Sequence, residues 1–258
     1  MMTFYSGTPG SGKSLHVARE IYNYLTFYKK NIITNIYINL DKVQGIKRDK
    51  KGNIKKIKHK SIGNYIYKNI HELSVEYLIA YSEHYHKHGK EGQTILIIDE
   101  AQTRFNPRMN PIDRLSWVHF FVEHRHLGFD VIVISPNLRL IDRQIRYNFE
   151  YEVQHRKANN NGILGLLLPF KLFVAVTVWA NSKDVAFSEM YLLRKKYISI
   201  YDSYADADVT GLMLDLKLLD KERSLYHTKL FQYKKAEIFY WIDYFLGKTP
   251  HPCGGGCL

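Results

Sequence analysis

The chain has 258 residues, of which 45% are hydrophobic, enough to bury the core of one large α/β domain and a smaller appendage. Its net charge of +12 favours anionic partners such as nucleic acid, ATP or acidic lipid head groups. The cysteines, Cys253 and Cys257, both lie in the final tail, which excludes a disulfide framework in the body and favours a reducing cytosol.

A phosphate-binding loop follows directly after the first predicted strand, residues 2–6, and this start leads us to expect no signal peptide. The loop has the pattern G-x-x-x-x-G-K-S/T, and its members are Gly7, Thr8, Pro9, Gly10, Ser11, Gly12, Lys13 and Ser14. Helical spacing over 13–28 completes the strand, loop and helix that an anion site requires. The pattern predicts that backbone N–H groups wrap the phosphates of ATP, that Lys13 reaches their oxygens, and that Ser14 binds Mg²⁺.

The next segments predict a strand at 32–38, a basic insert at about 42–60 and a helix at 71–88. The insert contains Asp49 as its only acid, and Gly52 near its middle indicates a hairpin tip. A solvated hairpin and an anion-binding arm are equally compatible with it. His84 and His88 share one face of the predicted helix, but an exposed polar helix end explains them better than a metal site.

A buried strand is predicted at 94–98, where apolar, β-branched residues end in Asp99-Glu100. An Asp in this place is the second Mg²⁺ anchor of phosphate-loop NTPases, and the Glu after it is placed to activate water. Acids at an ordinary helix N-terminus are the alternative explanation. Because ligands bind at the carboxyl ends of parallel strands, we expect Asp99 to meet the phosphate loop there. The carboxylate favours an ATPase over a GTPase that uses Gln.

Alternating elements continue with helices at 111–127 and 139–146 and strands at 130–135 and 149–155, a pattern typical of a parallel sheet with flanking helices. The apolar segment 162–179 has the length of a membrane span, but Pro169 and Lys171 lie at its centre. We therefore predict a turn there between strands. Further strands are expected at 171–180 and 190–200, followed by helices at 211–223 and 234–246.

The order of several motifs resembles the zonular occludens toxin (Zot) family, the assembly ATPases that filamentous bacteriophages use to extrude virions. Besides the phosphate loop, the resemblance rests on Asp99-Glu100-Ala101-Gln102, on Glu123-His124-Arg125-His126-Leu127-Gly128-Phe129-Asp130 and on Ile141-Asp142-Arg143-Gln144-Ile145-Arg146. It covers roughly residues 1–200. It implies a RecA-like P-loop NTPase fold of the additional-strand, catalytic-glutamate kind. The sequence pattern itself predicts a small C-terminal α+β appendage, with a helical part and flexible tail at 201–258.

The resemblance also implies roles for individual residues. Lys13, Ser14, Asp99 and Glu100 match the nucleotide motifs of the family. The strand at 130–135 departs from the usual Thr-Gln ending, and Asn137 is the candidate sensor of the γ-phosphate. A neighbouring subunit's arginine can neutralise charge on the transferring phosphoryl group, and Arg125 is our first candidate, before Arg143 and Arg146. A surface salt bridge is the alternative explanation for each of these arginines.

The implied setting is a ring-like homo-oligomer, such as a hexamer, at the cytoplasmic face of the host inner membrane. Phage coat and assembly proteins, and single-stranded phage DNA, would be its partners. Aromatic residues at 236–246, flanked by lysines, suggest peripheral membrane contact or packing on the ATPase domain. The basic charge leaves open a DNA translocase or helicase of a mobile element. A nucleotide-gated scaffold or an envelope-active toxin is a third interpretation.

Overall fold

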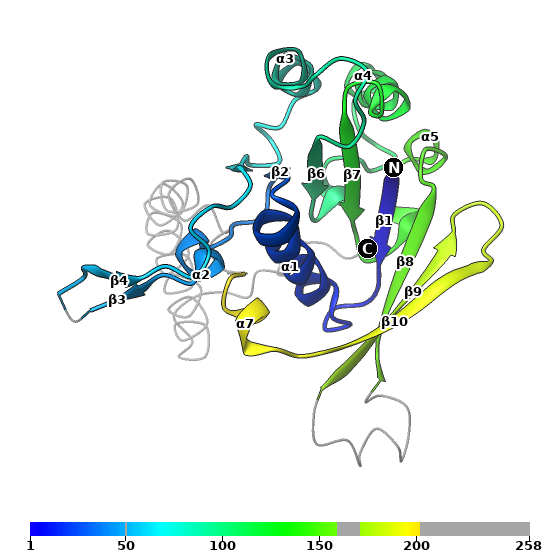
Figure 1. The fold of residues 1–258 in the computed structure, drawn as a ribbon. Helices are drawn as coiled ribbons and strands as arrows, with labels where there is room; N and C mark the ends of the chain where they lie inside the picture. The colour runs from blue at the N-terminus through cyan, green and yellow to red at the C-terminus, as the bar shows by residue number, and fades with distance from the viewer. Residues whose placement is uncertain (50, 159–170, 202–258) are drawn as a thin grey trace, which may run out of the picture. The chain divides into compact units, whose positions relative to one another are not determined.

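A mostly parallel eight-stranded sheet forms the centre of the protein (Figure 1). The computed structural model describes residues 1–49, 51–158 and 171–201, all within Met1–Asp206, the first of two units of the chain. The strand order is β10-β9-β8-β1-β7-β6-β2-β5. Every pair from β8 to β5 in this order is parallel, whereas β9 pairs antiparallel with both of its neighbours. The strands are β1 (Met2–Ser6), β2 (Asn31–Thr34), β5 (Tyr65–Tyr67), β6 (Thr94–Ile98), β7 (Phe129–Ile134), β8 (Tyr151–Lys157), β9 (Leu172–Trp179) and β10 (Val185–Leu192).

Helices cover both faces of this sheet, so its central strands are buried on both sides. All residues of β1 and of β6 are buried, which explains the continuous apolar run Ile95–Ile98 in β6. Phe4 joins the core beneath α3 (Val75–Tyr85), α4 (Pro111–Glu123) and α5 (Arg143–Arg146). Its neighbour Tyr5 joins the core beneath α1 (Lys13–Asn23). The alternation follows from the period of two along a strand.

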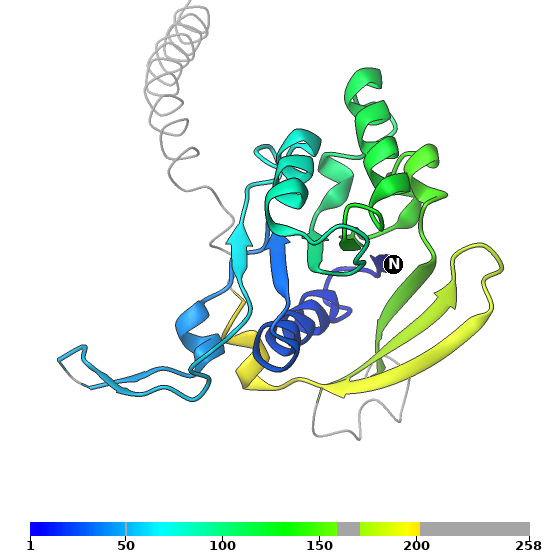
Figure 2. The ribbon, with the colours of Figure 1, turned by 45° about the horizontal axis from the view of Figure 1, so that its top comes forward.

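The basic insert contains the predicted hairpin, formed by β3 (Lys47–Arg48) and β4 (Ile54–Lys56). It follows α2 (Leu40–Gln44) and projects from the body of the domain, as both views show (Figures 1 and 2). Every residue of its two strands is exposed. The hairpin does not pack into either core. It is held by its own backbone pairing and turn and by an ion pair of Arg48 with Asp41 of α2 at 2.7 Å.

Several predicted element boundaries were wrong for local reasons. The helix expected at 13–28 becomes π-helical from Tyr24 to Tyr28. The helix expected at 71–88 begins only after its cap, Ser74. His86 lies outside this helix, because its two ring nitrogens bond the Leu127 carbonyl and Thr94 Oγ1, each at 2.6 Å. Among the described residues, no group of three or more potential ligands is arranged to hold a metal.

Other differences fall around the remaining strands. The strand expected at 32–38 ends at Thr34, whose hydroxyl accepts from the Ile36 amide at 3.1 Å. The helix expected at 139–146 is interrupted by extended Ile141, so it splits into a 3₁₀ turn, η3 (Leu138–Leu140), and α5. The strand expected at 190–200 is instead β10, followed by α7 (Lys195–Ile198), and β5 was not predicted.

The turn expected at Pro169 and the helices expected at 211–223 and 234–246 lie outside the described residues. Within the ranges that the structure does describe, no helix combines the length and the apolar character needed to cross a bilayer.

Candidate active site

The phosphate loop connects the carboxyl end of β1 to α1. Gly7, Gly10 and Gly12 have φ angles of 143°, 75° and 99°, which L side chains rarely adopt. A Cβ atom on Gly12 would also lie 2.6 Å from the ring of Phe173. Gly12 is the N-cap of α1 and has no side chain to bond the first helical amides, so these amides can receive an anion.

Lys13 joins the phosphate loop to the acidic motif. Its ammonium group donates to the carbonyl oxygen of Gly7 and, at 3.3 Å, to that of Thr8. Burial lowers the pKa of Lys13, and the negative charges of Asp99 and Glu100 oppose that shift. The ammonium group therefore lies within the field of both carboxylates, so the predicted meeting of the two motifs at the carboxyl edge of the sheet is present in the structure.

Asn35 fixes the backbone at Asp99. Its side-chain amide donates to the Asp99 carbonyl oxygen at 2.9 Å, and its oxygen accepts from the Asp99 amide at 2.7 Å. Asn35 follows β2, which pairs with β6, and only 9% of its surface is exposed. Our reading of the sequence missed it, although a polar residue at the end of a strand beside the acidic motif was a usable signal.

Glu100 has a left-handed backbone, with a φ of 48°. For a non-glycine residue this conformation costs about 1–2 kcal/mol, and such strain often accompanies function. The Glu100 amide donates to Asp99 Oδ1 at 2.8 Å, and its carboxylate accepts a hydrogen bond from Gln102 Nε2. The strained backbone and Gln102 together hold an exposed carboxylate in one direction beside the phosphate loop.

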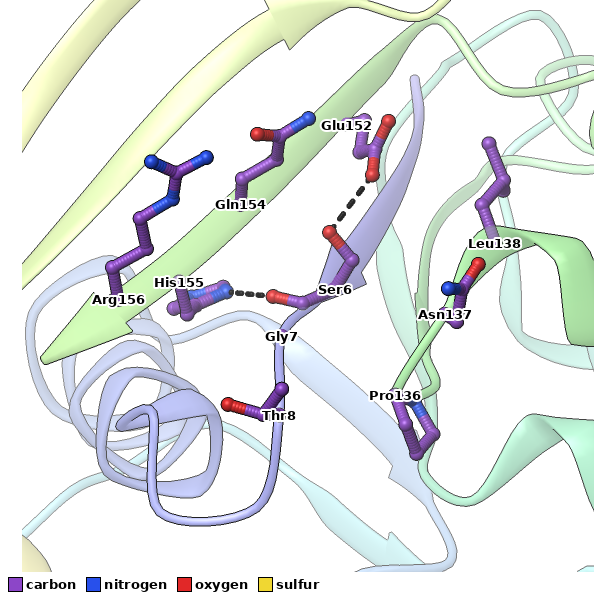
Figure 3. Close-up of a pocket in the computed structure, with 10 residues that line it drawn as sticks. All are labelled: Ser6, Gly7, Thr8, Pro136, Asn137, Leu138, Glu152, Gln154, His155 and Arg156. Atoms are coloured by element: carbon purple, nitrogen blue, oxygen red, sulfur yellow. Dashed lines mark hydrogen bonds between the residues drawn. The ribbon is translucent and has the colours of Figure 1, made fainter.

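Asn137 belongs to the segment that follows β7 and lies beside the phosphate loop. The Gly7 amide donates to the Pro136 carbonyl oxygen at 3.2 Å, which brings this segment against the phosphate loop. The side chain of Asn137 accepts from the Arg139 amide at 2.8 Å and so caps η3. Asn137 also lines a cavity of about 280 Å³ together with Gly7, Thr8 and residues of β8 (Figure 3).

The arginine candidates lie in different environments. Arg125 pairs with Glu150 at 3.0 Å, just before β7 and β8 begin, which is the edge of the sheet opposite to the phosphate loop. Arg143 donates to the Tyr147 hydroxyl at 3.0 Å, and Arg146 also belongs to α5, which packs on α4. By contrast, Arg156, which was not among the arginines expected from the sequence, lines the cavity described above and a second cavity of about 230 Å³ beside residues 8–11 of the loop.

The residues at this edge suit magnesium and a nucleotide. Ser14 and Asp99 offer hydroxyl and carboxylate oxygens, the ligands that Mg²⁺ prefers, and the nucleotide and water supply the rest of its coordination in such sites. The glycine amides, Lys13 and the start of α1 provide donors and positive charge for phosphate oxygens.

A comparison with known proteins identifies the family. The family model described as "Zonular occludens toxin (Zot)" matches residues 1–208. The chain belongs to the Zot family. Gene 1 protein of Enterobacteria phage M13 is 26% identical over 215 residues, which are 78% of this chain and 58% of that protein. This Zot-family chain thus matches little more than half of the length of its phage relative.

Two solved structures are similar to this Zot-family chain. The N-terminal domain of zonular occludens toxin from Neisseria meningitidis is 22% identical, with a TM-score of 0.47, over 78% of this chain and 98% of that one. A DnaB-like replicative helicase is 13% identical, with a TM-score of 0.50, over 76% of this chain and 57% of that one. The predicted α/β P-loop NTPase fold is confirmed. Its phosphate loop and acidic motif are those of the P-loop NTPase fold.

Proposed function

We propose that this Zot-family ATPase hydrolyses ATP to ADP and phosphate to drive the assembly and extrusion of filamentous phage virions through the host envelope. The observation that carries the proposal is the convergence of Lys13 with Asp99 and Glu100 in a chain of this family. A relative from phage M13 supports the phage setting. The single-stranded phage genome, coat proteins and assembly proteins are the proposed cargo and partners.

Each polar group of the site has a proposed role. Lys13 and the loop amides bind the phosphates, while Ser14 and Asp99 would hold Mg²⁺, which when bound neutralises phosphate charge. Glu100 accepts the proton of the attacking water, and Gln102 orients its carboxylate. Asn137 contacts the γ-phosphate side of the site.

The proposed working form is a ring-like homo-oligomer, such as a hexamer, on the cytoplasmic face of the host inner membrane. A neighbour's Arg125, Arg143 or Arg146 would complete each site. Arg125 lies far from its own phosphate loop and is half exposed, with 50% of its side-chain surface accessible, which suits a role toward another subunit. Membrane attachment would be peripheral.

Virion release tests the proposal directly. In cells that produce the phage, the gene for this chain is replaced by the Glu100→Gln variant. We expect release of particles to fall to background while phage DNA and coat protein still accumulate inside. Glu83→Gln, at an exposed position on α3, is the matched control and should release particles normally. Normal release by Glu100→Gln would contradict the extrusion motor.

The exposed basic hairpin favours one second candidate, a DNA translocase of a mobile element. Lys55 and Lys56 are exposed on β4 and belong to no described ion pair. Phosphate contacts from such lysines bind DNA without sequence preference and weaken in salt. A large stimulation of ATP hydrolysis by single-stranded DNA, lost in a Lys55→Gln and Lys56→Gln double variant, would favour this candidate over the extrusion motor.

A further inference from the structure

A buried polar chain runs beneath the phosphate loop and has no part in the proposed hydrolysis steps. Glu189 on β10 lies 2.8 Å from Nε2 of His16 on α1. Nδ1 of His16 lies 2.8 Å from Nε2 of His155 on β8. Nδ1 of His155 in turn lies 2.9 Å from the carbonyl oxygen of Ser6, the residue before the loop (Figure 3). The two histidines are 2% and 3% exposed.

The hydrogen bonds of this chain have one consistent direction. The Ser6 carbonyl only accepts, so His155 must donate from Nδ1. Burial, followed by the charge of His16, lowers the pKa of His155 to about 3, so His155 is neutral and accepts at Nε2. His16 therefore donates to His155 from Nδ1, and its Nε2 faces the Glu189 carboxylate at 2.8 Å. Each contact fixes the orientation of the next side chain, and the Glu189 carboxylate lies at the end of this chain of contacts.

A second contact from β10 reaches the other end of the loop. The hydroxyl of Tyr191 donates to the carbonyl oxygen of Gly12 at 3.2 Å. Its ring stacks on Phe173 of β9 at 5.7 Å and lies 5.0 Å from the ring of His16. Arg19 of α1 pairs with Glu189 at 2.7 Å and lies over the Tyr191 ring at 5.1 Å. Tyr191 and Glu189, two residues apart on one strand, thus hold both ends of the loop.

The other groups around His16 support this arrangement. Tyr5 of β1 stacks on His16 at 5.3 Å and donates to Glu20 at 2.6 Å, and Glu20 lies 3.7 Å from His16. Buried ionic groups contribute little net stability compared with apolar packing, because removing charges from water is costly. Stability alone therefore does not explain why this cluster contacts both ends of a glycine-rich loop. A role in fixing the geometry of the loop does explain it.

We propose that Glu189, His16, His155 and Tyr191 are positioning residues, through which the β9–β10 hairpin holds the phosphate loop in its nucleotide-binding shape. The inference rests on the proposed function only in taking ATP as the ligand of the loop. Glycine-rich segments lose much conformational freedom when they are ordered. Anchoring Ser6 and Gly12 before the nucleotide arrives removes part of that cost and so raises affinity.

The test removes the last hydrogen bond of each arm in the full-length protein. Tyr191→Phe deletes the donor to Gly12, and His155→Phe deletes the donor to Ser6. Tyr85→Phe, at a residue of α3 that is 63% exposed, is the matched control. Amide hydrogen exchange of residues 7–14 is measured without nucleotide, and affinity is measured with a fluorescent ATP analogue.

We expect faster loop exchange and affinity weakened about 2- to 10-fold in each variant, the size of one net hydrogen bond, with a smaller change in kcat than in KM. The control should match the wild type. Wild-type exchange and affinity in Tyr191→Phe, whatever its melting temperature, would overturn the inference. Should the wild type bind or hydrolyse no ATP, the proposed function fails, and the exchange measurement still decides this inference.

Discussion

At the scale of single residues, Glu100 combines a strained backbone with a carboxylate held by Gln102. Glu100→Gln keeps the size and the hydrogen-bonding capacity of the side chain but removes the base. We expect unchanged ATP affinity and a kcat lower by roughly 10²- to 10⁴-fold, the usual contribution of a general base. Steady-state phosphate release and nucleotide binding, measured in parallel, check this. A wild-type kcat would remove Glu100 from catalysis.

Lys13 should behave in the opposite way. Its ammonium group donates to the carbonyl oxygens of the loop and lies in the field of Asp99 and Glu100, where it can bind the phosphate oxygens of a nucleotide. Lys13→Ala should therefore lose nucleotide affinity itself, so that its KM for ATP rises. Equilibrium binding of ATP measures this, and wild-type affinity in Lys13→Ala would show that the loop binds phosphate through its amides alone.

Asn35 gives a stability prediction at the same scale. Asn35→Ala removes two hydrogen bonds to the Asp99 backbone, at 2.7 Å and 2.9 Å, and leaves their partners poorly solvated. We expect the free energy of unfolding to fall by about 1–3 kcal/mol, with weaker binding of Mg²⁺ and ATP. Urea unfolding measures the first effect. Asn31→Ala, at the opposite end of β2, is the control and should change both quantities less.

At the scale of elements, the β9–β10 hairpin is joined to α1 by a carboxylate whose protonation has a predictable effect. The hydrogen bond from His16, followed by that from Arg19, lowers the pKa of Glu189 from 4.5 to about 2. A depressed folded-state pKa stabilises the fold above the unfolded value and loses that contribution as the pH falls.

We therefore expect the stability of the wild type to decline between pH 4.5 and about 2 more steeply than that of Glu189→Gln, which cannot titrate. Urea unfolding across this pH range measures both slopes. Glu91→Gln, at an exposed position, should retain the wild-type slope. Equal slopes for the wild type and Glu189→Gln would show that this carboxylate is not linked to folding.

The elements that could be predicted have a local signal in the sequence. β6 is buried on both faces, so the uninterrupted apolar run Ile95–Ile98 identifies it, and β1 is identified by the phosphate loop that follows it. β5 is only three residues long and has no complete period, and most of β10 is exposed, so neither has a clear hydrophobic pattern. The phosphate loop is contiguous and was readable from its glycines and Lys13. The bond from Tyr191 to Gly12 joins residues 179 positions apart and could not be read from local spacing.

At the scale of the whole molecule, an arginine supplied by a neighbouring subunit requires an oligomer. The positions of the arginines relative to the phosphate loop separate those that need a second subunit from those that do not. Arg125 lies at the sheet edge opposite to its own phosphate loop, in an ion pair with Glu150. Arg125 could reach a bound phosphate only in another copy of the chain, after its ion pair with Glu150 breaks or is shared with that phosphate. Arg156 already lies beside the loop of its own chain, so a site completed within one subunit would use Arg156 instead.

Mixing variants distinguishes these two arrangements. Arg125→Ala subunits retain an intact phosphate loop, and Lys13→Ala subunits retain the arginine, so each supplies what the other lacks. We expect both to be inactive alone and their mixture to recover part of the ATP hydrolysis, with activity per subunit rising with protein concentration. Arg143→Ala and Arg146→Ala are mixed in the same way. If no mixture recovers while Arg156→Ala alone loses activity at every protein concentration, the site is complete within one chain and the ring must serve another purpose.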